Sequence, residues 1–178
     1  MIVTSDRFGS IETPDDDIIA FPNGVVGFPN DTAFVLLRPR DEARIAWLQS
    51  TTTPSMALPI ISLHEAAVDA PFDAFENATH QLGLAEDIND CAVLLVVTAN
   101  GGARATVNLL APIIVNASTR TGVQLLLDLD VRLLTAPLCL RPLGEPSISE
   151  IDEASESDDV PMVMTTNADN RYKAAAAE

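Results

Sequence analysis

The sequence predicts an all-β, mainly antiparallel fold: a small β-barrel-like domain or sandwich with one short helix, followed by a disordered acidic C-terminal tail. The first observation is a series of short apolar runs separated by turn residues over residues 1–140, which is typical of sandwiches and barrels. The second is a single stretch of helical periodicity at residues 71–82. The third is a change of composition after Gly144, where acidic and small polar residues replace apolar ones.

The expected strands are runs rich in aliphatic and β-branched residues, which favour extended backbone. They cover residues 1–4, 8–12, 17–21, 33–37, 46–50, 57–62, 91–98, 106–116, 123–127 and 131–134. Strong turn signals stand at residues 22–24, Pro-Asn-Gly, and at residues 100–102, Asn-Gly-Gly. For the first of these, a type I′ hairpin turn and a wider loop both remain open, because a proline precedes Asn23-Gly24.

The run at residues 105–116 is interrupted by Asn108, Pro112 and Asn116 at four-residue intervals. Pro112 excludes an unbroken central strand, because proline has no N–H and a fixed φ. We therefore expect the strand to bend at Pro112, as at a barrel corner or a sheet edge. A turn at residues 118–122 should then lead into the next strand.

One short amphipathic helix is predicted between Pro71 and Gly83. Apolar or small side chains recur there at helical spacing, at Phe72, Phe75, Ala78, Thr79 and Leu82. Proline suits the start of a helix, and glycine suits the position just after its end. A further helical turn is open at residues 85–89.

The composition divides the chain into a domain at residues 1–143 and an acidic tail at residues 144–178. The tail carries −7 of the formal net charge of −16. Residues 145–160 have few apolar side chains that could anchor them to a core, so we expect the tail to be disordered.

The charge of −16 also bounds the partners of the chain. Phosphates attract Lys and Arg, so the charge argues against direct nucleic-acid binding and against an anionic membrane surface. It favours a basic protein partner, or simply solubility. No apolar run approaches the ~18 residues of a membrane span, and residues 1–12 lack signal-peptide features. We therefore expect a cytoplasmic location.

Residues that commonly carry chemistry occur without the required patterns. Cys91 and Cys139 lie in apolar runs without a CxxC pattern, so we expect two buried, reduced thiols. His64 and His80 show no metal-binding spacing, and the Gly-Val-Val-Gly at residues 24–27 lacks the remainder of a phosphate loop. The sequence thus predicts no metal, no cofactor and no enzymatic activity. A hydrolase remains an alternative if one of the histidines meets an activated nucleophile in the fold.

Four motifs, in order, resemble those of the flagellar assembly factor FliW family. Residues 21–28, FPNGVVGF, are similar to the family's FP.GL.GF, and residues 46–50, AWLQS, contain its WLQS. Residues 91–98, CAVLLVVT, stand where the family has DVLVLVIVT. Residues 105–124, ATVNLLAPIIVNASTRTGVQ, are similar to its ANLLAPIVIN…R.G.Q. The resemblance covers roughly residues 1–140, and the chain departs from the family at residues 62–65 and 131–138.

The resemblance implies a small β-barrel-like domain with a regulatory binding role. Members of the family bind CsrA, a dimeric RNA-binding repressor, and keep it from flagellin messenger RNA. They also bind flagellin, which displaces them from CsrA, so that flagellin synthesis is coupled to secretion. Two further functions remain as alternatives: a chaperone that holds flagellin without CsrA antagonism, and a β-barrel that binds a small molecule in an enclosed pocket.

Candidate partner-binding residues are the members of the shared motifs that a buried strand does not need. Asn108 and Asn116 flank Pro112, and Arg120 lies in the following turn. The missing N–H of Pro112 should leave neighbouring backbone groups for a partner. The alternative is a structural role, because Asn side chains often satisfy backbone groups at bends.

Two further groups complete the candidate site. Trp47 and Gln49 should share one face of a strand, and tryptophan is enriched in protein interfaces as well as in cores. The loop from Phe21 through Gly24 to Phe28 forms the third group.

Overall fold

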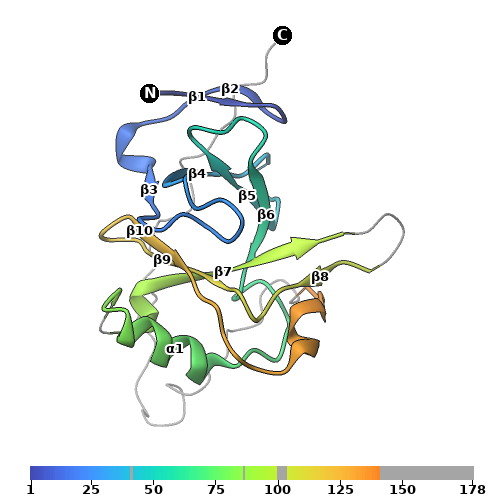
Figure 1. The fold of residues 1–178 in the computed structure, drawn as a ribbon. Helices are drawn as coiled ribbons and strands as arrows, with labels where there is room; N and C mark the ends of the chain where they lie inside the picture. Colours follow the sequence, from blue (N-terminus) through green and yellow to red (C-terminus); the bar gives the residue numbers. More distant parts are fainter. Residues whose placement is uncertain (41, 86, 100–103, 141–178) are drawn as a thin grey trace, which may run out of the picture.

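The computed structural model describes residues 1–40, 42–85, 87–99 and 104–140 (Figure 1). The turn predicted at residues 100–102 and the acidic tail at residues 144–178 lie outside the described residues. The domain boundary at residue 143 therefore stays a prediction.

Short strands dominate the chain, as the spacing of apolar runs predicts. In order they are β1 (Ile2–Ser5), β2 (Gly9–Glu12), the 3-10 turn η1 (Asp15–Asp17), β3 (Ile19–Ala20), β4 (Ala33–Leu37), β5 (Ile45–Ser50), β6 (Ala57–Ser62), α1 (Phe72–Gln81), η2 (Ile88–Asp90), β7 (Cys91–Thr98), β8 (Thr106–Val107), β9 (Ile113–Asn116), β10 (Thr121–Gln124), η3 (Val131–Thr135) and β11 (Ala136–Pro137).

The main sheet closes on itself. Its strands follow the order β7-β6-β5-β4-β3-β10-β9, and β9 pairs again with β7 (Figure 1). Every pairing is antiparallel except the one between β3 and β10, which is parallel. The prediction of an all-β, mainly antiparallel fold with one short helix is confirmed. Closure leaves the strands of this ring paired on both sides over part of their length, which limits the open edge that makes an ordinary sheet prone to aggregation.

Two smaller assemblies extend the barrel. The β1–β2 hairpin is a separate two-stranded sheet at one end of the molecule (Figure 1), and its Val3 and Ile11 pack against Val35 and Leu37 of β4. At the other end, β8 pairs with the last residues of β7 and with β11. There α1 packs its buried Phe75 into a second core cluster.

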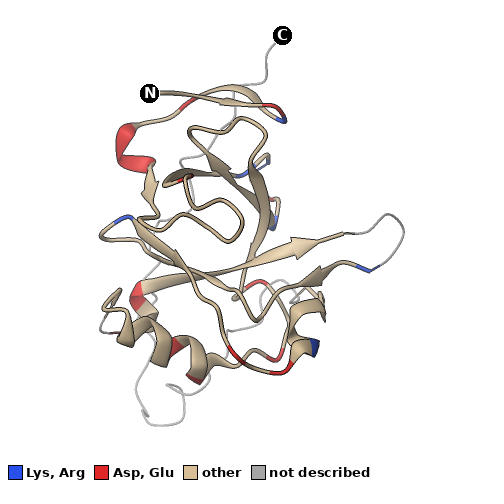
Figure 2. Cartoon of the chain, viewed as in Figure 1, with Lys and Arg blue, Asp and Glu red and all other residues tan. Residues whose placement is uncertain are grey.

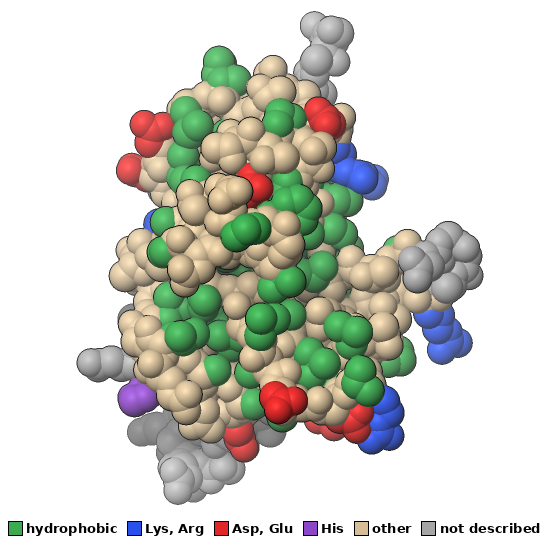
Figure 3. All heavy atoms as spheres, viewed as in Figure 1, with side chains coloured by type: hydrophobic (Ala, Val, Ile, Leu, Met, Phe, Trp, Pro, Cys, Tyr) green, Lys and Arg blue, Asp and Glu red, His purple; other side chains and the backbone are tan. Residues whose placement is uncertain are grey.

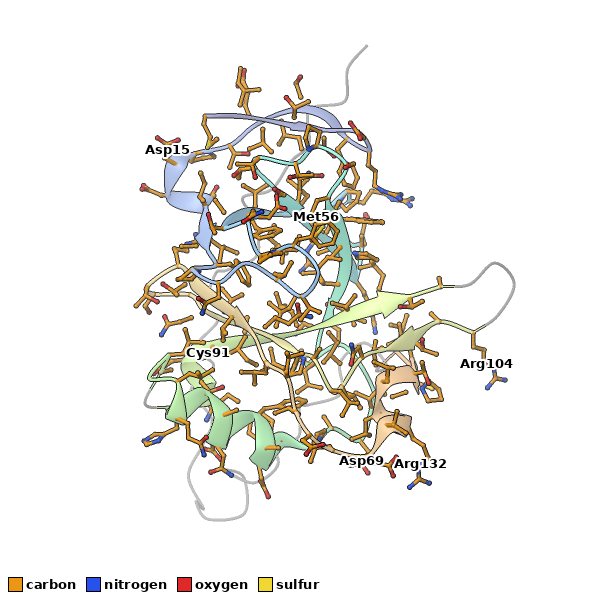
Figure 4. All side chains as sticks on the ribbon, in the orientation of Figure 1. Asp15, Met56, Asp69, Cys91, Arg104 and Arg132 are labelled. Atoms are coloured by element: carbon orange, nitrogen blue, oxygen red, sulfur yellow. The ribbon has the colours of Figure 1, made fainter. Side chains whose placement is uncertain are left out.

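Aliphatic side chains and a pair of phenylalanines fill the barrel. The rings of Phe21 and Phe34 meet edge to face, with their centroids 5.1 Å apart. Leu48, Met56 and Ile60 join the same cluster, and Figure 4 shows Met56 among side chains crowded between the strands. The interior is therefore a packed core.

The predicted helix is confirmed at Phe72–Gln81. Gly83 follows it with a φ of +62°, the left-handed conformation that glycine adopts at little cost. The amide of Leu84 then donates to the carbonyl of Thr79, 3.2 Å away, which ends the helix. The further helical turn left open after it occurs as the short η2.

Two expectations about local structure are wrong. The run at residues 131–134 forms the 3-10 helix η3 instead of a strand, because the Asp130 side chain accepts the main-chain N–H of Arg132 and caps a helical turn. The two cysteines are not both buried thiols. Cys91 is half-buried at the start of β7, whereas Cys139 is exposed just after the edge strand β11; both thiols are free.

Gly122 of β10 lies directly against the ring of Phe21, and we predict that Gly122→Ala destabilises the barrel. A Cβ at this position would lie 2.4 Å from the Cζ atom of Phe21. The ring is fully buried and cannot move without repacking, so the free energy of unfolding should fall by about 1–3 kcal/mol. Thermal or denaturant unfolding measures this. Phe21→Leu in the same chain should recover part of the loss, and an unchanged melting temperature for Gly122→Ala alone would contradict the prediction.

Candidate functional site

The loop after β3 carries the first motif and presents apolar side chains to solvent. Gly24 has a φ of +64°, and a Cβ there would lie 2.3 Å from the carbonyl oxygen of Phe28. Two tight turns follow one another: the N–H of Gly24 donates to the carbonyl of Phe21 at 2.8 Å, and Val25 and Phe28 exchange main-chain hydrogen bonds of 3.3 and 2.8 Å. Asn23-Gly24 is therefore not the centre of a two-residue hairpin turn. Val26 and Phe28 are consequently 56% and 40% exposed.

The strand that carries the fourth motif bends where Pro112 predicts. Val107 faces Val97, and Ile113 faces Leu94, so residues 108–112 of the bent strand stand opposite only residues 95 and 96 of β7. The side chain of Asn108 stabilises the bend, because its Oδ1 accepts the N–H groups of Leu110 and Ala111 at 2.9 and 3.1 Å. We call residues 108–112 the kink.

After a last hydrogen bond from the N–H of Asn108 to the carbonyl of Val96, at 3.1 Å, the kink leaves β7 but remains bonded to the chain that follows β10. The N–H of Leu125 donates to the carbonyl of Pro112, and the N–H of Leu127 donates to that of Leu110, both at 2.9 Å. The bonds that a regular pair would make in the opposite direction, to the carbonyls of Leu125 and Leu127, are missing. Pro112 has no N–H, and the N–H of Leu110 donates to the Oδ1 of Asn108. The carbonyls of Leu125 and Leu127 therefore lack these bonds, whereas the carbonyls of Leu110, Ala111 and Pro112 each accept a hydrogen bond.

The Gln124 side chain joins the loop to the kink. Its Oε1 accepts the N–H of Val26 at 2.8 Å, and its Nε2 donates to the carbonyl of Ala111 at 3.1 Å. Leu126, two residues further along in the extended chain that follows β10, points to the same side and is 74% exposed. We call Val26, Phe28, Gln124 and Leu126 the loop–kink surface.

Charge is absent from the centre of this surface. Figure 2 shows no charged residue along β9 or along the loop from Phe21 to Phe28. In Figure 3, hydrophobic side chains gather across the middle of the same view. Acidic residues lie around it, in η1, in α1 and in the segment that follows β10 (Figure 2). The arrangement is an apolar patch with an acidic surround.

Asn116 and Arg120 act within the scaffold. Asn116 is only 7% exposed; its Nδ2 donates to the carbonyl of Leu84 at 3.0 Å, and its Oδ1 accepts two N–H groups of the following turn. Arg120 has a φ of +53°, and its Nη2 lies 3.3 Å from an Oδ1 of the buried Asp17. The expectation that the polar motif residues are exposed is therefore wrong for Asn116.

The WLQS motif is also structural in its contacts. Trp47 is half-buried beneath the β1–β2 hairpin, edge-on to Phe8 at 5.7 Å and with the Arg7 guanidinium 4.0 Å from its ring centre. Gln49 is fully buried. Its Nε2 lies 3.0–3.3 Å from four main-chain carbonyls in the turn between β5 and β6. Because these carbonyls all converge on one buried amide group, the Gln49 side chain holds the turn in place. Gln49 is thus inaccessible to a partner, contrary to expectation.

The predicted site residues therefore separate by exposure. Phe28 lies on the loop–kink surface, and Gly24 and Asn108 shape its two segments. Phe21 and Pro112 are buried, as are Gln49 and Asn116. Sequence reasoning missed Gln124, although it is the one polar residue in the run 123–127 and so carried a detectable signal.

Two features that carry other functions are absent from the described residues. Among them, no three His, Cys, Asp or Glu side chains are close enough together to hold a metal ion. Within the same ranges, no helix has the length and apolarity needed to cross a bilayer.

Comparison with known proteins agrees with this architecture. Residues 2–138 match the model of the FliW protein family. The chain belongs to the FliW family. It is 33% identical over 157 residues to the flagellar assembly factor FliW of Desulfovibrio desulfuricans, covering 85% of this chain and 93% of the relative. It is 35% identical over 128 residues to that of Caldicellulosiruptor bescii, covering 71% and 83%.

A solved structure shares the fold. The crystal structure of a flagellar assembly factor FliW superposes with a TM-score of 0.59 at 27% identity, over 82% of this chain and 100% of that chain. FliW membership accounts for the order of the four motifs, and the structure adds that two of them meet at the loop–kink surface through Gln124.

Asn116→Ala should destabilise this FliW-family chain while leaving partner binding by the folded molecules unchanged. The substitution leaves the Leu84 carbonyl and two turn amides without their partner, at a cost of about 1–3 kcal/mol. Urea unfolding measures the loss. The matched control is Ser118→Ala, an exposed position in the same turn, which should change little. Normal stability with weakened partner binding would instead place Asn116 in the interface.

The carboxylate of Asp31 gives a pH-dependent stability. The hydroxyl groups of Ser50 and Thr53 hold the pKa of this carboxyl below its ordinary value of 3.8. A group whose pKa is lower in the folded state stabilises the folded chain fully above its unfolded-state pKa. This stabilisation is lost as the pH falls through its folded-state pKa. The stability advantage of the wild type over Asp31→Asn should therefore be full at pH 7 and shrink below about pH 4. Unfolding measured across this range tests it, and an advantage that persists undiminished at pH 2 would contradict it.

Proposed function

We propose that this chain is a cytoplasmic flagellar assembly factor that works by binding proteins. It binds the translational repressor CsrA and antagonises it, and it also binds flagellin, so that flagellin synthesis follows secretion. The names of its relatives support the flagellar role, and the resemblance of its motifs to the FliW family supplies the two partners. In this proposal the chain contacts neither nucleic acid nor a membrane and catalyses no reaction.

The loop–kink surface is the observation that carries a binding role. It combines exposed Val26, Phe28 and Leu126 with a polar group, Gln124, at its centre. Apolar side chains clustered on a surface and ringed by polar residues are typical of sites that bind proteins. Tight anchoring of the loop by Gly24 and Gln124 keeps the surface ordered before binding, which lowers the entropic cost of association.

Charge complementarity supports CsrA as a partner. A protein that binds RNA presents basic surface, and this chain has a net charge of −16. An acidic protein is attracted to such a surface over long range, and this raises the association rate.

The flagellin-holding chaperone is the second candidate. An exposed apolar surface also suits a protein that shields apolar segments of a secreted subunit. A small-molecule-binding barrel is less well supported, because Phe21, Phe34, Leu48 and Ile60 fill the interior. A depression of about 390 Å³ beside the β1–β2 hairpin opens to solvent.

Binding of purified CsrA should be tight and its association rate should fall as salt rises. Exposed charges are screened beyond ~8 Å at physiological ionic strength, so the attraction between unlike surfaces weakens. Surface plasmon resonance at 50, 150 and 500 mM salt would measure it. If the chain binds flagellin but does not bind CsrA, the function that remains is that of a flagellin-holding chaperone.

A matched pair of variants locates the contact. Val26→Asp places a charge in the loop–kink surface and should weaken CsrA binding about tenfold, the effect of losing ~1.4 kcal/mol. Leu82→Asp makes the same change at a similarly exposed position, 58%, just after α1, and should have no effect. Equal affinities for both variants would place the contact elsewhere.

A further inference from the structure

Beyond the end of β10 at Gln124, the extended chain that bonds to the kink has one open edge. In an antiparallel pair, alternate residues direct both main-chain groups to the same neighbour. Leu125 and Leu127 bond to the kink, so Gln124 and Leu126 direct their N–H and C=O groups the opposite way. Strand β3 covers that side only as far as the pairing of Thr121 with Ala20.

Among the described residues, none pairs with this edge through its main chain beyond β3. The loop reaches Gln124 through its side chain alone. The main-chain groups of Gln124 and Leu126 form no hydrogen bond with any residue of the described ranges. Leu126 is also the most exposed large hydrophobic side chain among the described residues, at 74%. Unpaired backbone beside exposed apolar side chains is the structure that accepts an added strand.

We propose that residues 124–128 receive an extended apolar segment of a partner protein, which pairs as an additional strand and carries a basic residue opposite Asp128. Main-chain hydrogen bonds to Gln124 and Leu126 would hold the segment. Alternate side chains of the segment would contact Leu126 and Val26 of the loop–kink surface. This inference rests on the proposed function for the idea that the occupant is a protein.

Charge selects the occupant. Asp128 is exposed and forms no ion pair or hydrogen bond with the described residues. A second copy of this chain would bring its own Asp128 and its net charge of −16 to the same edge. Residues 145–160 of the tail are a poor occupant for the same reason, because they are acidic and contain no basic residue. A segment with a Lys or Arg would be attracted to Asp128, whereas a second copy of the chain and residues 145–160 would be repelled by it.

The test uses a ten-residue synthetic peptide of alternating valine and threonine with a terminal lysine, and the same peptide with a terminal glutamate. The lysine peptide should bind the full chain with a dissociation constant at or below the millimolar range. The glutamate peptide should bind roughly two- to fivefold more weakly, the effect of one exposed ion pair. Asp128→Lys should reverse this preference.

Two variants separate the backbone from the side chain. Leu126→Ala keeps the N–H and should weaken the peptide only in part, whereas Leu126→Pro removes the N–H and should abolish binding. Because Leu126→Pro could disturb folding, hydrogen exchange in the wild type gives a second readout. The peptide should slow exchange of the Leu126 amide and leave that of Leu127, already bonded to Leu110, unchanged.

Failure of the strand-addition site can be distinguished from failure of the proposed function. No binding of the lysine peptide at millimolar concentration, or exchange at Leu126 that the bound peptide does not slow, overturns the strand-addition site whatever CsrA does. Absence of binding to both CsrA and flagellin overturns the proposed function whatever the peptide does.

Discussion

The bend at Pro112 is the constraint on which the rest of the molecule depends. One continuous segment, residues 106–116, must serve two sheets: β8 at its start pairs with the end of β7 and with β11, and β9 at its end closes the barrel. A regular strand could not leave β7 and rejoin it three residues out of step. Pro112 removes the N–H that would enforce regular pairing, and Asn108 supplies the acceptor that the freed amides require.

The displaced kink also brings the first and fourth shared motifs together at the surface. It brings the Ala111 carbonyl within reach of Gln124, whose other end holds the loop at Val26. Gly24 admits the close approach of the Phe28 carbonyl that shapes this loop. A surface built in this way is rigid because each half is fastened to the barrel by main-chain hydrogen bonds. That rigidity is a property of the closed sheet more than of the exposed side chains.

Local chemistry made the elements predictable, whereas burial of polar residues depended on tertiary contacts. The bend at Pro112 and the helix between Pro71 and Gly83 follow from φ restrictions that each residue carries wherever it stands. The burial of Gln49 does not, since it depends on four main-chain carbonyls, those of Ser50, Thr53, Pro54 and Met56, that only the folded turn brings together. The sequence therefore marked the right segments but assigned exposure to polar residues that the fold uses internally.

The same limit explains Gln124 and the helix η3. A glutamine in an apolar strand is visible in the sequence, but its two partners lie 98 and 13 residues away. A pattern in the residues next to Gln124 in the sequence cannot indicate partners at these distances. At residues 131–135, apolar spacing favoured a strand, and a single local cap from Asp130 decided for a helical turn.

The parallel pairing of β3 with β10 has a consequence for the order of events during synthesis. Ala20 pairs with Thr121, so the first strand of the closed sheet waits for a partner about 100 residues further along the chain. At a synthesis rate of about 5–20 residues per second, that wait lasts about 5–20 seconds. Throughout it Phe21 lacks Gly122, the residue against which its ring later rests. The barrel can close only after most of the described chain has emerged, so the nascent protein spends those seconds with one edge of β3 unpaired and with the Phe21 ring packed on one side only, against Phe34.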